Sequence, residues 1–251
     1  MTPGLVSVFS LTIDRYELTK ETITKNFERA KQFAPIEWLV ADNGSKDRRV
    51  VEFVARHPLL AYHRVNSKNE GVSHAFNQLY LRSKGEYLCF MGSDLELPEG
   101  WLQEMLGYLR TVPNIGMVGI DWGHGGIPPL TVKHGKNAHW LDLKFNRVFG
   151  VWMMNRSVVD NLGLFYEGFD VYGLEDSDFN ERVNRFGYHS CYISNEKWKC
   201  VHLGVRDHDK GEYRKMKNKS MEKNAAIFME RAYHNYKDGL KEPLPPMREP
   251  L

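Results

Sequence analysis

Cysteine is scarce in this sequence, and long apolar runs are missing from it. The only cysteines among its 251 residues are Cys89, Cys191 and Cys200, and no two of them form a C-x-x-C pair. An odd number of dispersed cysteines, two of them in apolar strand-like runs, argues against a disulfide framework and predicts buried free thiols in a reducing compartment. No stretch reaches the ~20 apolar residues that a membrane helix needs, so we expect no transmembrane segment.

The N-terminus also lacks the features of a secretory leader. Its sequence MTPGLVSVFSLTIDRYE is partly apolar, yet it has neither a basic n-region nor a small-residue cleavage site. A cytoplasmic protein is therefore expected, either free or peripheral to a membrane or an assembly. The composition, with 42% hydrophobic, 12% aromatic and 26% charged residues, is that of an ordinary globular protein with a real core.

A large net charge is absent as well, which excludes a global electrostatic attraction to polyanions. The formal net charge is +2. Positive charge is nevertheless concentrated in residues 197–223, where nine lysines and arginines accompany four carboxylates. Trp198, Tyr213 and Met216 are interleaved with these cations. This basic segment is either a solvated surface or a binding site for a polyanion.

Strand-like and helix-like segments alternate along the first half of the chain. β-branched and aromatic runs predict strands, whereas apolar residues three and four apart predict helices. The predicted strands are 5–13, 36–42, 59–65 and 86–91, and the predicted helices are 17–33, 46–56 and 70–83. Such alternation is typical of right-handed crossovers. It predicts an α/β fold of the Rossmann-like kind, in which helices flank a mostly parallel central sheet as an α/β/α sandwich.

The second half of the chain has a less regular pattern. Its predicted helices are 98–110, 156–163, 175–187 and 223–236, and its predicted strands are 115–122, 146–155 and 188–193. Residues 123–139 are rich in glycine, proline and histidine and predict a long loop, a type that often serves as a lid. We expect the proline-rich C-terminal tail to be frayed.

Polar residues directly follow three of the predicted strands. These strand ends read TIDR (12–15), DNGS (42–45) and SDLE (93–96). Ligands of open α/β sheets bind outside the carboxyl ends of the strands, so a binding crevice is expected here. Carboxylate oxygens suit Mg²⁺ or Mn²⁺ that also bind a substrate's phosphates, and Asp94 and Glu96 point the same way in an extended chain. For Asp42, an Asx-turn is an equal alternative that does not exclude binding.

A second acidic cluster, Glu175, Asp176 and Asp178, precedes an amphipathic helix. Acids at a helix N-terminus stabilise its dipole by about 0.3–1 kcal/mol each, which alone explains part of the pattern. Three acids within four residues exceed what capping requires, and a carboxylate placed there can act as a general base toward a hydroxyl. His202 follows an apolar run and is either structural, a metal ligand or a phosphate contact.

Four segments, in order, carry a resemblance to a known family. They are SLTIDRYELTKETI, EWLVADNGSKD, NEGVSHAFNQLYLRSKGEYLCFMGSDLELPEGWL, and GLEDSDFNERVNRFGY followed by CVHLG. Residues 5–205 thereby resemble the inverting, nucleotide-sugar-dependent glycosyltransferases of family 2, which have the GT-A fold. The resemblance implies a donor-binding half over residues 1–96 and an acceptor-binding and catalytic half of the same domain over 97–205. Residues 206–251 are then a basic C-terminal helical segment and tail.

The resemblance also implies roles for individual residues. Asp94 matches the metal-binding acid, Asp176 the catalytic base, Glu175 a neighbour that positions the acceptor, and His202 a histidine of the metal or diphosphate site. Thr12 and Asp42 match nucleoside contacts, and Asn69 and Gly71 line the same pocket. With the strand-end residues added, the expected donor-binding set is Thr12, Asp14, Arg15, Asp42, Asn69, Gly71 and Ser93.

The expected reaction is the metal-assisted transfer of a sugar, with inversion, from a nucleotide-diphosphate sugar to a hydroxyl acceptor. Mn²⁺ or Mg²⁺ is the expected metal and a UDP-sugar the expected donor, with dTDP and GDP as alternatives. The acceptor is a saccharide or another hydroxyl compound, or a polyanion such as nucleic acid with a hydroxylated base.

Two positions depart from the family's pattern. Gly92 replaces the first acid of the D-x-D motif, with Glu96 as a candidate substitute, and Phe76 replaces an arginine, whose contact is lost or has moved to His74. An inactive nucleotide-sugar-binding module is therefore an alternative. A sugar-1-phosphate nucleotidyltransferase is disfavoured, because the first strand is not followed by a glycine-rich basic loop.

Overall fold

The computed structural model describes every residue except 33, 122–142, 146–147, 194–195, 204–210 and 235–251. Within that part of the chain, the strands of the main sheet are β1 (Thr2–Thr12), β2 (Ile36–Asp42), β3 (Leu60–Val65), β4 (Gly85–Gly92), β6 (Ile115–Ile120), β7 (Leu143–Phe145), β8 (Val151–Asn155) and β9 (His189–Ile193). A second, two-stranded sheet pairs β5 (Leu95–Glu96) with β10 (Val201–His202).

The described strands form an eight-stranded sheet in the order β3-β2-β1-β4-β8-β6-β9-β7. β1 is parallel to both β2 and β4, and β2 is parallel to β3. β8 is antiparallel to β4 and β6, and β7 is antiparallel to β9, whereas β6 and β9 are parallel. The predicted α/β fold with a mostly parallel sheet is confirmed.

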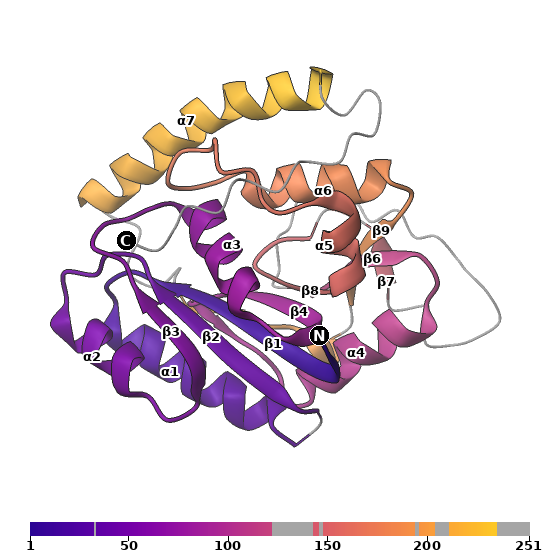
Figure 1. The fold of residues 1–251 in the computed structure, drawn as a ribbon, viewed down its shortest axis with the longest axis horizontal. Helices are drawn as coiled ribbons and strands as arrows, with labels where there is room; N and C mark the ends of the chain where they lie inside the picture. The colour runs from indigo at the N-terminus through magenta and orange to yellow at the C-terminus, as the bar shows by residue number, and fades with distance from the viewer. Residues whose placement is uncertain (33, 122–142, 146–147, 194–195, 204–210, 235–251) are drawn as a thin grey trace.

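Helices cover both faces of this sheet (Figure 1). They are α1 (Tyr16–Ala30), α2 (Arg48–Arg56), α3 (Val72–Arg82), α4 (Trp101–Thr111), α5 (Arg156–Leu162), α6 (Glu175–Arg185), a short 3-10 helix η2 (Glu196–Trp198) and α7 (Gly211–His234). Apolar side chains from α1, α2 and α4 form one core with one face of the sheet, and those from α3, α5 and α6 form a second core with the other face. In Figure 1, α7 lies along the outside of the second layer, beside α6.

Strand β4 shows why the sheet is buried on both faces. Tyr87, Cys89 and Met91 enter the core of α1, α2 and α4, whereas Leu88 and Phe90 enter the opposite core. Alternate side chains of a strand point to opposite faces, so a continuous apolar run is needed to fill both layers.

The cysteines are free and buried, as the sequence predicted. Burial raises the pKa of the Cys89 and Cys191 thiols above their usual range and that of Cys200 to about 12. Among the described residues, no helix combines the length and the apolar character that crossing a membrane requires.

Several element boundaries differ from the prediction. α1 ends at Ala30 rather than at 33, and the strand predicted from 146 begins at Val151 as β8. The largest difference is α7, which begins at Gly211 instead of 223. Its buried residues Ser220, Asn224 and Arg231 are polar, so its buried face lacks the apolar spacing that would have predicted the full helix. The short strands β5 and β10 form only because segments over a hundred residues apart meet in the fold.

Candidate active site

The ends of β1, β2 and β4 meet at one edge of the sheet, as predicted. Thr12 lies opposite Asp42, and Leu11 lies opposite Gly92 in the strand register. The Thr12 hydroxyl is buried and shares a hydrogen bond with the Thr19 hydroxyl of α1, at 2.7 Å between the oxygens. Three polar strand ends therefore lie at one edge of the sheet.

The predicted Asx-turn at Asp42 is present. Its carboxylate is fully buried and accepts hydrogen bonds from the Ser45 backbone N–H, at 3.1 Å, and from the Ser45 hydroxyl. Burial raises the pKa of Asp42, while the bonds from Ser45 oppose that shift. The turn fixes the direction of the Asp42 carboxylate. The contact of Asp42 with a nucleoside stays a prediction.

Asp14 and Arg15 leave β1 in an unusual backbone conformation. Both have positive φ, 52° and 56°, a region in which ordinary residues are strained. The Asp14 Oδ1 accepts hydrogen bonds from the N–H groups of Lys46 and Asp47, at 2.7 and 2.9 Å. Asp14 thereby holds the turn after β2, and its neighbour Arg15 is directed toward Asp94.

Asn43 connects the two predicted donor-binding segments, although no sequence pattern distinguished it from its neighbours in the turn. Its Nδ2 donates to Asn69 Oδ1, at 2.9 Å, and to the Gly71 carbonyl, at 3.3 Å. Its Oδ1 accepts from the Glu70 N–H, at 3.0 Å. Gly44, with φ 85°, lies so close to the backbone of Lys68 that an added Cβ would be 2.5 Å from the Lys68 carbonyl carbon. The turn after β2 and the segment before α3 are thus one unit.

Asp94 and His202 meet through the small second sheet. β10 pairs with β5, which places His202 opposite Leu95, and the Leu203 N–H donates to the Asp94 carbonyl at 2.8 Å. The His202 Nε2 is consequently 3.7 Å from Asp94 Oδ2. Arg15 Nη1 approaches the same oxygen at 3.5 Å. All three side chains are about one-fifth to one-quarter exposed, so solvent and ligands can reach them.

The Asp94–His202 pair fits a divalent cation. Metal–ligand bonds of about 2.1 Å allow two donor atoms up to about 4.2 Å apart to share one ion, and the observed separation of 3.7 Å satisfies this. No group of three or more metal-ligating side chains occurs within the described ranges. The remaining coordination positions would belong to substrate oxygens and water, which is common when phosphates are bound.

Gly92 lies beneath the Asp94 carboxylate. A Cβ at position 92 would be 3.1 Å from Asp94 Oδ1, so any side chain there would press on the candidate ligand. Glycine at position 92 therefore removes a possible acidic ligand, and it also leaves room for the Asp94 carboxylate.

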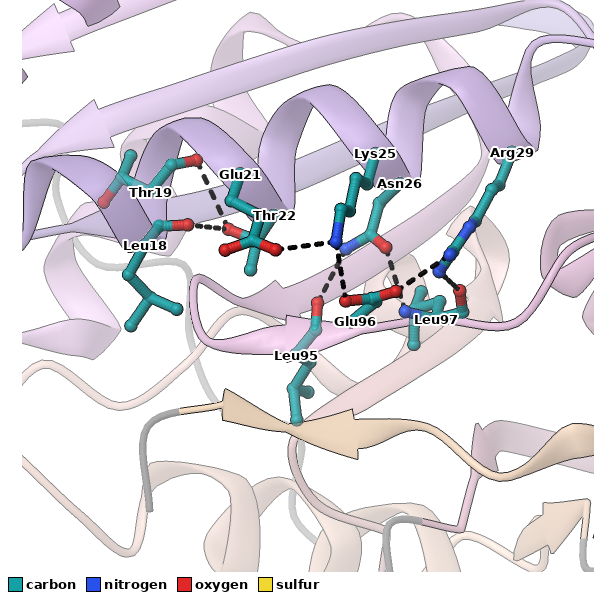
Figure 2. A network of polar contacts seen from close by, with 10 residues as sticks. All are labelled: Leu18, Thr19, Glu21, Thr22, Lys25, Asn26, Arg29, Leu95, Glu96 and Leu97. Atoms are coloured by element: carbon teal, nitrogen blue, oxygen red, sulfur yellow. Dashed lines mark hydrogen bonds and ion pairs between the residues drawn. The ribbon is translucent and has the colours of Figure 1, made fainter. Parts of the chain in front are cut away.

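Glu96 does not join Asp94, and the prediction that it substitutes for the missing acid is wrong. Glu96 Oε1 accepts from Arg29 at 2.8 Å, and Oε2 accepts from Lys25 at 3.2 Å, both on α1 (Figure 2). Asp94 lies in a turn before β5 rather than in an extended segment with Glu96. The two carboxylates therefore do not share a face.

The Glu175–Asp176 pair begins α6, where the helix dipole favours negative charge. Burial, with the adjacent Asp176 carboxylate as a second cause, raises the pKa of Glu175 to about 8. The Asp176 Oδ1 accepts from the Ser177 N–H at 2.7 Å. These two acids differ from Asp178, which is completely buried between two arginines.

Asp178 is structural, so only two of the three clustered acids are candidates for chemistry. Arg231 of α7 donates to Asp178 Oδ1 at 2.8 Å, and Arg182 of α6 donates to Oδ2 at 3.1 Å. Arg182 also donates to the carbonyls of Leu162 and Leu164, at 2.9 Å each. A buried carboxylate paired in this way joins α5, α6 and α7.

Phe76 is a core residue, packed edge-to-face against Phe90 with ring centroids 5.2 Å apart. His74 contacts Glu167 through Nδ1, at 2.9 Å, and Glu70 through Nε2, at 3.3 Å. These partners give His74 a role in linking α3 to the segment before α6. The predicted lid, residues 123–139, lies outside the described part of the chain.

The chain is similar to known glycosyltransferases in both sequence and structure. The family model described as "Glycosyl transferase family 2" matches residues 7–163. No curated protein sequence matches the chain.

Three solved structures illustrate the structural similarity. Mannosyltransferase PcManGT from Pyrobaculum calidifontis, in complex with GDP-Man and Mn²⁺, has 20% identity and a TM-score of 0.60, over 81% of this chain and 58% of that protein. GalNAc-T7 with UDP, GalNAc and Mn²⁺ has 15% identity and a TM-score of 0.65, over 93% and 49%. S. aureus TarS 1–349 has 16% identity and a TM-score of 0.57, over 77% and 59%.

This chain matches only 49–59% of the length of each of those three proteins. The family match covers more than half of the chain itself. The chain therefore belongs to glycosyl transferase family 2 and has the GT-A fold.

Proposed function

We propose that the protein transfers a sugar from a nucleotide-diphosphate sugar, with UDP as the favoured carrier, to a hydroxyl acceptor with inversion at the anomeric carbon. The observation that carries this proposal is the 3.7 Å approach of His202 to Asp94 at the end of β4. It is supported by the GDP-Man and Mn²⁺ bound by the neighbour PcManGT and by the UDP, GalNAc and Mn²⁺ bound by the neighbour GalNAc-T7.

Asp94 and His202 would hold the metal, and their chemistry favours Mn²⁺ over Mg²⁺. Mg²⁺ takes oxygen ligands almost exclusively, whereas an imidazole nitrogen suits transition metals. When bound, the ion neutralises charge on the diphosphate leaving group. Arg15, 3.5 Å from Asp94, adds a second positive charge beside the same position.

The nucleoside would occupy the edge formed by β1, β2 and the segment before α3. Thr12 and Asp42, paired at the ends of β1 and β2, would contact the nucleoside there, and Asn69 and Gly71, both bonded to Asn43, would close the edge. Asp14 and Ser93 complete the set as supports of the neighbouring turns: Asp14 holds the turn after β2, and the Ser93 carbonyl accepts from Thr22 at 2.8 Å.

Asp176 would act as the general base. The acceptor oxygen attacks the anomeric carbon, the bond from that carbon to the diphosphate breaks, and the acceptor's proton passes to the Asp176 carboxylate. A raised pKa keeps Glu175 protonated near neutral pH, so the charge of the pair rests on Asp176. A neutral Glu175 can donate a hydrogen bond to the acceptor and position it.

A turnover assay tests this proposal. Wild-type protein is incubated with UDP-, GDP- and dTDP-sugars, with Mn²⁺, Mg²⁺ or EDTA, and release of the nucleoside diphosphate is followed by anion-exchange chromatography. We expect release from one nucleotide class, faster with Mn²⁺ and abolished by EDTA. If the protein binds the donor but releases no nucleoside diphosphate, with or without an added hydroxyl acceptor, it is instead an inactive binding module.

A polyanionic acceptor is a second candidate, favoured by the position of α7. Arg214, Lys215 and Lys219 are exposed on its first half. The Lys217 Nζ lies 4.3 Å from the centre of the Tyr172 ring, and Tyr172 is in the loop that leads to Glu175. Lys217 therefore lies beside the proposed acceptor site, and the three exposed cations extend the positive charge over the outer surface of the same helix. Trp198, by contrast, is buried against Gly100 and does not belong to that surface.

Charge reversal tests the second candidate. An Arg214→Glu, Lys215→Glu, Lys219→Glu variant should lose activity on a nucleic acid acceptor with hydroxylated bases while retaining donor hydrolysis. The wild-type rate should fall steeply with salt, because phosphate contacts release counterions. Transfer to neutral saccharides that is indifferent to both salt and charge reversal would exclude this acceptor class.

The free, buried cysteines are compatible with the cytoplasmic location predicted above.

A further inference from the structure

A buried asparagine of α7 holds the loop that presents the proposed base. Asn224 has no exposed surface, and its Oδ1 accepts from the Asp170 N–H at 2.7 Å. Its Nδ2 donates to the Tyr172 carbonyl, at 3.0 Å, and to the Gly173 carbonyl, at 2.8 Å. One amide thus satisfies three backbone groups of a segment that ends directly at Glu175.

The loop has a conformation that needs such support. Gly173 and Leu174 have φ of 94° and 72°, so two consecutive residues are in the left-handed region immediately before the acids. For a non-glycine residue such as Leu174 this conformation is strained, and it persists only when the surroundings impose it. The bonds from Asn224 are external constraints that impose it from the side of α7.

α7 is itself fixed on the other side of the same acids. Arg231, two turns after Asn224 on the same helix face, donates to Asp178 at 2.8 Å. Its guanidinium carbon lies 3.7 Å from the centre of the Tyr166 ring. The buried face of α7 therefore forms hydrogen bonds with the chain on both sides of the two acids, through Asn224 before Glu175 and through Arg231 after Asp176.

The contact between α7 and the loop is also close at Gly173. A Cβ at this position would be 2.0 Å from the sulfur of Met221, one turn before Asn224. Met221 is exposed and its side chain can move aside, but a φ of 94° strains any residue that carries a Cβ. A side chain at Gly173 would therefore strain the loop backbone, which provides a second and independent way to disturb the arrangement.

We propose that Asn224 is a positioning residue for the transfer step, and that α7 holds Glu175 and Asp176 in the orientation that accepts the acceptor's proton. The inference rests on the proposed function. It predicts that loss of the Asn224 amide affects the chemical step more than donor binding, because its hydrogen bonds go to Asp170, Tyr172 and Gly173 and not to Asp94, His202 or the ends of β1 and β2. The same loop also lies near the proposed donor site, since an added Cβ at Gly71 would be 3.4 Å from the Val171 Cα. It also explains why the helix buries Ser220, Asn224 and Arg231 instead of apolar residues.

The test compares Asn224→Ala and Gly173→Ala with Val54→Ala. Val54 is fully buried in α2, in the opposite core from α6, so its truncation controls for lost stability. For both loop variants we expect kcat to fall about 10- to 100-fold, as small misplacements of catalytic groups do, with the Kd for the donor and Mn²⁺ unchanged within about twofold of wild type. Amide hydrogen exchange of residues 170–176 should accelerate in both loop variants and stay slow in Val54→Ala.

Two results would overturn the inference. One is an Asn224→Ala variant with wild-type kcat and unchanged exchange in residues 170–176, which would show that the amide positions nothing. The other is a parallel loss of donor affinity and kcat, which would assign Asn224 a general structural role. Failure of the proposed function can be distinguished from failure of this inference. In that case the wild-type protein itself would release no nucleoside diphosphate, whatever the amide hydrogen exchange of residues 170–176.

Discussion

At the scale of single residues, Glu175 and Asp176 are adjacent carboxyls with different expected chemistry. A pKa raised to about 8 by burial and by the neighbouring charge keeps Glu175 mostly neutral near pH 7, while Asp176 lies in the first turn of α6 with its Oδ1 on a backbone N–H. Separation of protonation states between neighbouring acids is how a site assigns one group as base and the other as hydrogen-bond donor.

Replacing Asp176 by Asn should remove the base and keep the shape of the site. We expect kcat to fall by about 10²–10⁴, the usual contribution of general base catalysis, with donor affinity unchanged. Steady-state kinetics and calorimetry measure the two quantities. Glu181→Gln is the matched control, because Glu181 is on the same helix and pairs with Arg185 at the surface. Equal effects in both variants would contradict the assignment.

The raised pKa of Glu175 should also appear in stability. Between its ordinary value near 4.5 and about 8, the folded protein holds a proton that the unfolded chain has released. The free energy of unfolding therefore decreases as pH rises through this range. Glu175→Gln should remove that decrease and be more stable than wild type at pH 8 by at least about 1 kcal/mol. Urea denaturation at pH 5 and pH 8 measures it, and an identical pH dependence in both proteins would contradict the raised pKa of Glu175.

At the scale of elements, the accuracy of prediction from sequence depended on how local the determining contacts are. β2 was predicted with its observed ends, 36 and 42, because its apolar run lies between Pro35 and the Asn43–Gly44 turn. Glu96 was misassigned because its partners Lys25 and Arg29 lie about seventy residues away in the sequence. No local pattern contains that information.

Helix-borne asparagines were missed for the same reason. Asn26, Asn77, Asn180 and Asn224 each use one amide to accept from a backbone N–H and to donate to a backbone carbonyl outside their own helix. In the sequence they are unremarkable polar residues within helices. Only the packing shows that their side chains replace the backbone hydrogen bonds that irregular segments lack.

The junction of α6 and α7 should depend strongly on Asp178. Asp178→Asn leaves Arg182 and Arg231 buried without a countercharge, so we expect the free energy of unfolding to fall by about 3–5 kcal/mol. Chemical denaturation measures the loss. The exposed pair of Glu28 and Lys31 is the control, and Glu28→Gln should cost less than about 1 kcal/mol. A loss of that small size for Asp178→Asn would show that α7 is only loosely attached.

At the scale of the whole molecule, the order of strands explains where the chemistry lies. β1 occupies the centre between β2 and β4, so the strand ends with Thr12, Asp42 and Asp94 share an edge. This much followed from the alternation of strands and helices. The second half of the site required tertiary pairing, because β10 brings His202 to Asp94 and α7 supports the loop before Glu175.

The central claim is that Asp94, and not Glu96, holds the metal that binds the donor. The most direct measurement is calorimetric titration of the active nucleotide sugar, with Mn²⁺ present, into wild type, Asp94→Asn and Glu96→Gln. We predict that Asp94→Asn weakens donor binding at least about tenfold, that Glu96→Gln binds like wild type, and that EDTA removes the difference between wild type and Asp94→Asn. Equal affinities for Asp94→Asn and wild type in Mn²⁺ would contradict the account.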